Sequence, residues 1–531
     1  MAIVSALLNG SVSGDSNQQK LLVCAQSNGA IDEILERLSK GLWTDNGVYQ
    51  KPPAGSIVRT GLGYRLRQRE KKVAAFCVET MVEEELGGDW QKEVDSLHAE
   101  LQELQSRMGK NKSAMEELEK KRGSMSFSDN SQGLPSASPL RKAQQNQEER
   151  DGLKKQMDRD GRRIREIKEI IATKQRLRKE ARAAKSLELI SRARVVCATL
   201  SGSGSEILRQ QNLTFETVII DEAAQAVEVA TLIPLKNRCR QCILVGDPNQ
   251  LPATVVSKEA SQRKFDQPLF SRLQQAGHKV LMLDIQYRMH PAIAAFPSAH
   301  FYQSKLKNGE NVLSGDYQKP FHSDPIFPPL AFFDVSDTCE ISKGQSVYNK
   351  KEALCLLKLL AHFLSSHSSS VTTIGIIAPY NGQRSHILQE IQRSSYQYPK
   401  GTVFMVDTVD GFQGREVDVL FFSATRTSRL GFLADVRRLN VALTRPKFGL
   451  YIFGYSPLLS SNEAWSALIE HTKKSNCYFE TENGDNLIHK SKSAPVKPSV
   501  PSSRREMTDI ERAINVLNKQ PQKSRIILEK N

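Results

Sequence analysis

The sequence has few cysteines and no long apolar run. Nowhere among its 531 residues do about eighteen apolar residues follow one another, which excludes a membrane-spanning helix of ordinary length. Eight cysteines are sparse for this length, and Cys24, Cys197 and Cys242 stand in apolar runs, so we expect them to be buried thiols of a reducing compartment. Cys239 and Cys242 form a single C-x-x-C pair without a second ligand pair, so a zinc site is not predicted.

Acidic residues are outnumbered by basic ones. The chain has 74 Lys and Arg against 59 Asp and Glu, which gives a formal net charge of +15. This balance favours a polyanionic partner such as nucleic acid, although a basic tail contributes part of the excess. The opening residues MAIVSALLNG are apolar but lack the basic start of a secretory signal, and we expect a helix there.

Two apolar runs between Thr217 and Pro252 each end in a polar turn. Val218–Ile220 precedes Asp221 and Glu222, and Cys242–Val245 precedes a turn that contains Asp247 and Gln250. Apolar runs without alternation predict strands buried on both faces of a parallel sheet. Because chemistry in open α/β sheets lies at the carboxyl ends of the strands, these polar residues are candidates for a functional site.

The residue types in the two turns suit a nucleotide. One carboxylate of Asp221-Glu222 can hold Mg²⁺, and the other can orient or deprotonate an attacking water. A bare Asp-Glu pair is more often two surface acids at the end of a strand. The second turn, Gly246-Asp247-Pro248-Asn249-Gln250, favours the nucleotide site, because a glutamine on a Gly/Pro-rich turn can reach a γ-phosphate.

Two turns nearer the N-terminus are candidates for phosphate contacts. Ser27 and Asn28 follow the apolar run Lys20–Ala25 and open a helix, so backbone N–H groups and short polar side chains face outward there. Thr199 stands near the end of the apolar run 194–200, and Ser201 opens the Ser/Gly turn that follows it. An ordinary helix cap and a flexible loop are the respective alternatives.

Residues 90–190 differ in composition from the rest of the chain, being rich in Glu, Lys, Arg and Gln. Two sets of apolar residues recur at heptad spacing. The first set is Val94, Leu97, Leu101, Leu104, Met108, Met115 and Leu118, and the second is Leu153, Met157, Ile164, Ile167 and Ile171. They predict two long helices that fold back as an antiparallel hairpin with a flexible tip around Gly123 to Pro139, the alternative being an intermolecular coiled coil.

Three literal motifs follow in the C-terminal half. Q-Y-R-M-H-P spans Gln286–Pro291, V-D-T-V-D-G-F-Q-G-R-E spans Val406–Glu416, and N-V-A-L-T-R spans Asn440–Arg445. Tyr287 can stack on a base and Arg288 can reach a phosphate. Residues 476–531 are rich in Ser, Pro and Lys, which predicts a disordered basic tail.

The ordered series of motifs resembles the Upf-like branch of superfamily 1 helicases (superfamily 1B), and most closely the senataxin family. The resemblance implies an α/β fold of two RecA-like parallel-sheet domains, with the hairpin inserted in the first. We expect the first domain at 1–275 and the second at 276–475. The resemblance also implies ATP and Mg²⁺ as cofactors, 5′-to-3′ translocation on RNA or DNA, and unwinding of RNA or RNA–DNA duplexes. The nucleus is the expected location, with the cytoplasm as a second one.

The resemblance assigns roles to individual residues. Asp221 binds Mg²⁺, Glu222 activates water, and the γ-phosphate is contacted by Gln250, Arg288 and Arg445, the last as an arginine finger. The nucleotide is also contacted by Tyr287 and Glu416. Nucleic acid is contacted by Ser27, Asn28, Arg59, Thr199, Ser201 and Thr408.

One motif of that family is absent from the sequence. No G-x-x-x-x-G-K-[ST] loop, which cradles the β- and γ-phosphates, occurs in the 531 residues. We therefore expect an N-terminally truncated form of the helicase. The alternatives are a non-catalytic nucleic-acid-binding or scaffold protein, and a protein that binds partner proteins through the 90–190 hairpin or the basic tail.

Overall fold

The structure is a computed structural model that describes residues 2–9, 20–44, 47–61, 71–125, 137–209, 213–367, 370–393, 402–482 and 486–489. Its contacts divide into two compact units. The first comprises residues 1–220 and 232–243, and the second comprises 221–231 and 244–531. Residues 244–275, which the sequence predictions assign to the first domain, are grouped by their contacts with the second unit. The domain boundary near residue 275 therefore stays a prediction.

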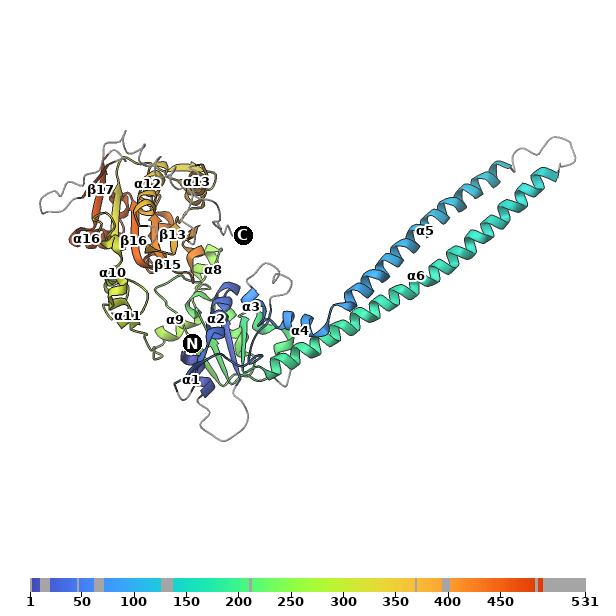
Figure 1. The fold of residues 1–531 in the computed structure, drawn as a ribbon, viewed down its shortest axis with the longest axis horizontal. Helices are drawn as coiled ribbons and strands as arrows, with labels where there is room; N and C mark the ends of the chain where they lie inside the picture. Colours follow the sequence, from blue (N-terminus) through green and yellow to red (C-terminus); the bar gives the residue numbers. More distant parts are fainter. Residues whose placement is uncertain are drawn as a thin grey trace. The chain divides into compact units, whose positions relative to one another are not determined.

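A five-stranded sheet forms the centre of the first unit (Figure 1). Its order is β4 (Ile57–Arg59), β5 (Val195–Thr199), β1 (Leu21–Ala25), β6 (Thr217–Ile220) and β7 (Gln241–Leu244). The first four strands run parallel, and every residue of β1 and β6 is buried. The apolar runs without alternation thus form strands covered on both faces, as predicted.

The prediction of burial was wrong for β7. Cys24 and Cys197 are buried, but Cys242 is exposed, and no residue of β7 is fully buried. The reason is the position of β7, which is the last strand in the order of the described sheet and has a neighbour on one side only. A run of apolar residues indicates a strand but not whether that strand lies inside the sheet or at its edge.

Short helices accompany this sheet. They are α1 (Ala2–Asn9), α2 (Asn28–Lys40), α3 (Lys71–Ala74), α4 (Val78–Leu86) and α7 (Glu228–Leu235), the last of which crosses the division between the units. The α2 helix buries Ile31, Leu35 and Leu38, whose spacing places them on one face. A small hairpin pairs β2 (Leu42–Trp43) with β3 (Tyr49–Gln50).

Residues 90–190 form the predicted antiparallel hairpin of α5 (Asp89–Met125) and α6 (Ala137–Arg192), whose helices run side by side in Figure 1. Ion pairs between the helices show that the two run antiparallel, because the residue number on one helix falls as the number on the other rises. The pairs are Glu93–Lys174, Glu100–Arg163, Arg107–Asp160 and Glu119–Arg150. Leu104, Ile167 and Ile171 form the apolar centre of the seam. The predicted tip falls mostly on residues 126–136, outside the described part of the chain.

A seven-stranded sheet forms the centre of the second unit. Its order is β14 (Val403–Asp407), β13 (Thr373–Ile377), β15 (Val417–Ser423), β16 (Pro446–Gly454), β10 (Leu330–Val335), β17 (Tyr478–Glu482) and β18 (Asn486–His489). All neighbours are parallel except β17 and β18. Because β17 and β18 belong to this sheet, the prediction that disorder begins at residue 476 was wrong. Tyr478 and Phe479 are buried apolar residues that pair with β10. Lysines near them in the sequence indicated a basic tail, so the strand was not predicted.

Side chains of the second sheet alternate between two apolar clusters. Leu330 and Phe332 of β10 point to one cluster, while Phe333 and Val335 point to the other. The first cluster includes α10 (Pro291–Phe301), α14 (Val436–Leu443) and α16 (Glu463–Lys474), and the second includes α12 (Lys350–His367) and α13 (Asn381–Arg393). The sheet is therefore covered by helices on both faces, which is the α/β arrangement predicted from the sequence.

The remaining elements are short. They comprise α8 (Lys258–Gln262), α9 (Leu269–Gln275), α11 (Glu310–Leu313), α15 (Ser456–Leu459), and the strand pairs β8 (Ile285–Gln286) with β9 (Lys307–Asn308) and β11 (Ile341–Lys343) with β12 (Ser346–Tyr348). Within the described ranges, no helix has both the length and the apolar character needed to cross a membrane.

Candidate functional site

In the first unit, the two predicted contact turns and the predicted contact residue Arg59 lie at the same edge of the sheet. Their strands β4, β5 and β1 are parallel neighbours, so their carboxyl ends coincide. Ala25 pairs with Thr199, and the Leu200 N–H donates to the Ala25 carbonyl at 3.0 Å. Ser27, Asn28, Thr199 and Ser201 therefore lie at one edge of the sheet.

Three of these side chains also have a local structural role. Ser27 is the N-cap of α2, and its hydroxyl accepts from the Ala30 N–H at 3.1 Å. The Thr199 hydroxyl accepts from the Gly202 N–H at 3.0 Å. Asn28 Oδ1 accepts from Arg59 at 3.0 Å. Ser201 is exposed and forms no side-chain cap bond. The ordinary-cap interpretation of Ser27 is therefore correct, and it leaves the exposed backbone turn available to an anion.

The predicted nucleic-acid contact of Arg59 was wrong. Its side chain is 1% exposed, and Nη1 lies 2.6 Å from Asp32 Oδ1. A guanidinium that is buried against a carboxylate and the Asn28 amide has no surface to offer a phosphate. Arg59 instead ties the end of β4 to the first turns of α2. The sequence could not reveal this pairing, because Asp32 and Arg59 belong to different elements.

In the second unit, Asp221 and Glu222 begin the turn that follows β6, and Glu222 has an unusual backbone. Its φ of 52° and ψ of 37° are left-handed, which costs a residue with a side chain on the order of 1–3 kcal/mol. The Gln225 amide donates to Glu222 Oε2 at 2.8 Å, and Gln413 Nε2 donates to Gln225 Oε1. Strain of this kind is concentrated at functional sites, where the surrounding contacts hold it in place.

The two polar turns predicted to form one site are in direct contact. The Ala223 N–H donates to the Val245 carbonyl at 2.8 Å. Gly246 sits so close that a Cβ atom there would lie 2.7 Å from the Ala224 nitrogen. Glycine is therefore required at the start of the Gly246–Pro252 turn for the turn to pack against the segment that carries Glu222.

Gln250 is held at both ends of its amide. Asp247 Oδ2 accepts from Gln250 Nε2 at 3.0 Å, and Gln250 Oε1 accepts from Arg445 Nη2 at 3.2 Å. Asp247 Oδ1 accepts from the Asn249 N–H at 2.9 Å, which closes the turn. Two residues that the family resemblance assigns to the γ-phosphate, Gln250 and Arg445, are thus hydrogen-bonded to each other.

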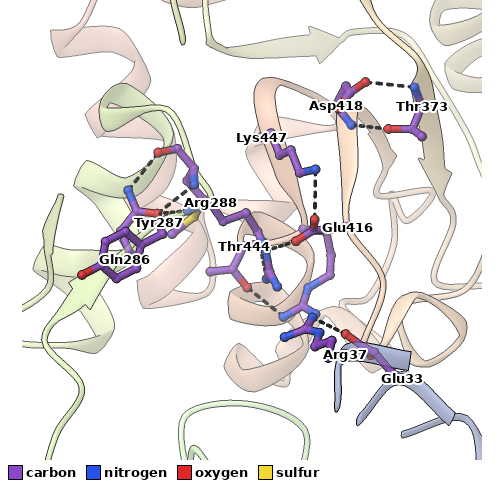
Figure 2. A network of polar contacts seen from close by, with 12 residues as sticks. Glu33, Arg37, Gln286, Tyr287, Arg288, Thr373, Glu416, Asp418, Thr444 and Lys447 are labelled. Atoms are coloured by element: carbon purple, nitrogen blue, oxygen red, sulfur yellow. Dashed lines mark hydrogen bonds and ion pairs between the residues drawn. The ribbon is translucent and has the colours of Figure 1, made fainter. Parts of the chain in front are cut away.

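A second group of charges surrounds Glu416 (Figure 2). Arg288 Nε lies 3.0 Å from one carboxylate oxygen, and Lys447 Nζ lies 2.9 Å from the other. Arg288 Nη1 also donates to the Thr444 carbonyl at 3.1 Å. Burial favours a raised pKa for Glu416, but Lys447 and Arg288 outweigh it and hold the pKa below its ordinary value. Glu416 is therefore an anion that fixes two cations in place.

Tyr287 lies beside this group and presents its ring to solvent, being 63% exposed. The ring covers Gly309, where a Cβ atom would meet it at 2.4 Å. An exposed aromatic ring that is packed against Gly309 on one side suits stacking on a planar ligand. Thr408 lies at the end of β14, and its hydroxyl accepts from the Gly411 N–H at 3.3 Å.

The candidate residues therefore fall into two groups. Asp221, Glu222, Gln250, Tyr287, Arg288, Thr408, Glu416 and Arg445 belong to the second unit, whereas Ser27, Asn28, Thr199 and Ser201 belong to the first. Sequence reasoning missed Gln225, Gln413, Tyr302 and Asn440. Gln225 donates to Glu222 and accepts from Gln413, while Tyr302 and Asn440 contact the turn that carries Gln250. Gln413 and Asn440 stand inside the quoted motifs, which was the available signal; Gln225 and Tyr302 carried none.

The described residues contain no group of three or more His, Cys, Asp or Glu side chains suited to hold a metal. A magnesium ion bound with a nucleotide needs only one or two protein carboxylates, because water and phosphate oxygens fill its remaining positions. Asp221, which is partly buried directly after β6, fits that requirement. The chemistry of the site therefore suits Mg²⁺ bound with a nucleotide.

Comparison with known proteins identifies similar sequences along most of the chain. Two family models, both described as AAA domain, match residues 1–258 and 265–457. Helicase sen1 of Schizosaccharomyces pombe is 36% identical over 495 residues, which cover 88% of this chain and 28% of that protein. A probable helicase of Dictyostelium discoideum is 34% identical over 502 residues, covering 93% of this chain and 42% of that protein.

Further relatives match over shorter stretches. Probable helicase senataxin of Mus musculus is 36% identical over 316 residues, covering 56% of this chain and 12% of that protein. The chain thus spans less than half the length of these relatives. Among solved structures, an arterivirus helicase in complex with DNA aligns at 15% identity over 50% of this chain and 45% of that chain, with a TM-score of 0.25, which is too low for a structural inference.

Proposed function

Because the chain belongs to the Upf-like branch of superfamily 1 helicases, near the senataxin helicases, we propose that it acts as the motor core of an ATP-dependent nucleic-acid helicase. The observation that carries the proposal is the hydrogen-bonded assembly of Gln250 and Arg445 within one compact unit that also holds Glu222. Residues suited to sense a phosphate and to activate a water are thereby combined. Motor domains of this type require such a combination for nucleotide hydrolysis.

The acidic turn supplies the proton chemistry in this proposal. Asp221 would hold Mg²⁺, which would neutralise phosphate charge when a nucleotide is bound. Glu222 orients the attacking water and accepts its proton. The Gln225 amide, which donates to Glu222 at 2.8 Å, fixes the rotation of that carboxylate. The left-handed backbone of Glu222 supports the assignment, because such strain is retained where a side chain must be aimed.

The cations stabilise the charge that develops on the phosphoryl group. Arg445 acts as the arginine finger, an effect of roughly 10³–10⁵ in rate in related systems. Arg288 contributes a second guanidinium, which Glu416 holds in position through the 3.0 Å ion pair. Tyr287 stacks on the base of the nucleotide. The guanidinium groups of Arg288 and Arg445 are each held by a partner before a ligand arrives, which lowers the cost of ordering the site.

The turns that carry Ser27, Asn28, Thr199 and Ser201 in the first unit are proposed to contact nucleic acid, and Thr408 is proposed as a separate contact in the second unit. Their N–H groups and short polar side chains suit phosphate and sugar oxygens and read no base. We propose RNA or an RNA–DNA hybrid as substrate, movement in the 5′-to-3′ direction, and a nuclear location. The names of the relatives support a helicase, and the positive net charge of +15 supports a nucleic-acid partner.

A second candidate function is a nucleic-acid-binding or scaffold protein without turnover. It is favoured by one specific observation, the absence of G-x-x-x-x-G-K-[ST] from the 531 residues. That loop normally supplies the amides and the lysine that hold the β- and γ-phosphates. In this case the hairpin of α5 and α6, or the basic tail, would carry contacts to partner proteins.

RNA-stimulated ATP hydrolysis by the 531-residue chain distinguishes the two candidates. For a helicase we expect turnover that the Glu222→Gln variant lowers by about 10²-fold or more, because the substitution removes the proton acceptor but keeps the shape. The matched control is Glu463→Gln on the exposed start of α16, which should leave turnover unchanged. RNA binding without any turnover in the unaltered chain would contradict the motor and favour the scaffold.

A further inference from the structure

Tyr302 connects three segments that are distant in the sequence. It follows the last residue of α10, and its hydroxyl donates to Asp247 Oδ2 at 2.7 Å. The same hydroxyl oxygen accepts from Asn440 Nδ2 of α14 at 2.8 Å. All three residues belong to the second unit. A phenol hydroxyl has one proton to donate and lone pairs to accept, so both functions of the group are used.

The Asp247 carboxylate links the Tyr302 hydroxyl to the Gln250 amide. Its Oδ2 atom accepts both the Tyr302 hydroxyl and Gln250 Nε2, the second at 3.0 Å. A carboxylate accepts only, so the Gln250 amide must turn its NH₂ group toward Asp247. Its oxygen then faces Arg445, whose Nη2 donates to it at 3.2 Å. The orientation of the amide is thereby set by the acid behind it.

Asn440 fixes the opposite end of the same arrangement. Its side chain is fully buried, and Nδ2 donates to the Asn249 carbonyl at 2.9 Å as well as to Tyr302. Arg445 lies one residue beyond the C-cap of the same helix, α14, and its Nε donates to the Val441 carbonyl at 2.9 Å. The Gly246–Pro252 turn is therefore bonded directly to α14 by Asn440–Asn249 and to the residue beyond its C-cap by Gln250–Arg445, and Tyr302 bridges Asp247 of the turn to Asn440.

The protonation of the hydroxyl supports this geometry. Burial raises the pKa of Tyr302 well above its ordinary range, and the neighbouring Asp247 carboxylate raises the pKa further. The raised pKa of Tyr302 favours the protonated phenol, which is the form that donates to Asp247. Asn440 donates rather than accepts, so it does not compete for that proton.

We propose that Tyr302 is a positioning residue that, by holding Asp247 and Asn440 on one hydroxyl, sets the Gln250 amide against Arg445. It touches no reacting atom itself. The catalytic consequence rests on the proposed nucleotide hydrolysis, because Gln250 and Arg445 are the pair assigned to the phosphoryl group. The structural consequence, a coupling between Gln250 and Arg445 that depends on the hydroxyl, does not rest on it.

A double-mutant cycle, measured by thermal unfolding, tests the structural consequence, which is the coupling between Gln250 and Arg445. The shifts in unfolding temperature caused by Gln250→Ala and Arg445→Ala are measured singly and together, first in the unaltered chain and then in the Tyr302→Phe background. We expect the two shifts to be non-additive in the unaltered chain and additive after Tyr302→Phe, because loss of the hydroxyl frees the amide. Non-additivity of the same size in both backgrounds would overturn the proposal.

Steady-state kinetics test the catalytic consequence. For Tyr302→Phe we expect kcat for RNA-stimulated ATP hydrolysis to fall about 10-fold or more, while KM for ATP stays within about threefold, because geometry and not binding is altered. The control is Tyr478→Phe, which removes a hydroxyl that donates to Asp334 at 2.7 Å in the same unit and should leave kcat unchanged. An equal loss of kcat in both variants would overturn the positioning role. If the unaltered chain shows no turnover, the proposed function fails, and the double-mutant cycle still decides the inference.

Discussion

Arg59 and Arg37 both form an ion pair with a carboxylate of α2, but only the first pair is buried. Arg59 is 1% exposed beside Asp32, whereas Arg37 is 55% exposed beside Glu33. Removing one partner of a buried pair leaves the other charge without compensation, so Arg59→Ala should lower the unfolding free energy by about 3 kcal/mol or more. Arg37→Ala, the control, should cost under about 1 kcal/mol. Urea denaturation measures both, and equal losses would contradict the buried role.

Glu352 predicts a pH dependence of stability. The residue is fully buried on α12; burial raises its pKa to about 8, while hydrogen bonds from Ser423 and the Thr425 N–H act against that rise. The unfolded chain releases this proton near its ordinary value of 4.5, and the folded chain retains it until about 8. The protonated Glu352 carboxyl therefore stabilises the fold at low pH, and this stabilisation is lost as the pH rises from 4.5 to about 8. Within this window the free energy of unfolding falls by up to about 1.4 kcal/mol per pH unit.

The variant Glu352→Gln isolates that contribution, because glutamine keeps an acceptor oxygen for Ser423 and Thr425 but does not ionise. Urea denaturation at pH 6, 7 and 8 should show a smaller decline for the variant than for the unaltered chain. Parallel declines would mean that Glu352 does not titrate in this window. The buried carboxylate also supports an unusual backbone conformation, because Thr425 has a φ of 72° and its N–H donates to Glu352 at 2.8 Å.

The sequence predicted residues whose role depends on a local motif. Asp221, Glu222 and Gln250 follow strands, and a strand end followed by polar residues is visible in the order of the letters. Arg59 and Tyr302 could not be predicted, because their partners lie on other elements and the pairing exists only after the chain has folded. For Arg59 the sequence even favoured the wrong role, since a basic residue at a strand end is compatible with both a phosphate and a buried carboxylate.

Helices and strands also differ in how well the sequence predicts them. The buried strands β1, β5 and β6 and both hairpin helices were predictable, because apolar runs and heptad spacing are local patterns. The edge position of β7 and the pairing of β17 were not, because strand order is a property of the whole sheet. Local pattern therefore predicts that an element exists, whereas its neighbours decide how much of it is covered.

The hairpin of α5 and α6 depends on a narrow seam. Ile167 is fully buried there, and Ile170, three residues further on the same helix, is 38% exposed. Ile167→Ala should destabilise the pairing by about 2–5 kcal/mol. Hydrogen exchange of the helix amides in the full chain should then accelerate roughly 30-fold or more. Ile170→Ala is the control and should change exchange by only a fewfold; similar acceleration in both would contradict the seam.

For the whole molecule, the net charge of +15 and the turns at the edge of the first sheet are two proposed sources of nucleic-acid affinity. A pair of variants separates them, because each places one negative charge on an exposed serine. Ser201→Glu alters a proposed contact turn, and Ser366→Glu alters the end of α12 in the other unit. Both lower the net charge by one, so a purely long-range effect would weaken RNA binding equally.

We expect Ser201→Glu to raise the Kd for single-stranded RNA about 5- to 10-fold at low salt, and Ser366→Glu to raise it less than twofold, because screening confines the strong repulsion to about a Debye length. The measurement is a binding titration at several salt concentrations. The slope of log Kd against log salt should become shallower for Ser201→Glu only, since a phosphate displaced from the turn no longer releases its counterion there. Equal shifts for the two variants would assign the affinity to overall charge and remove the turns from the interface.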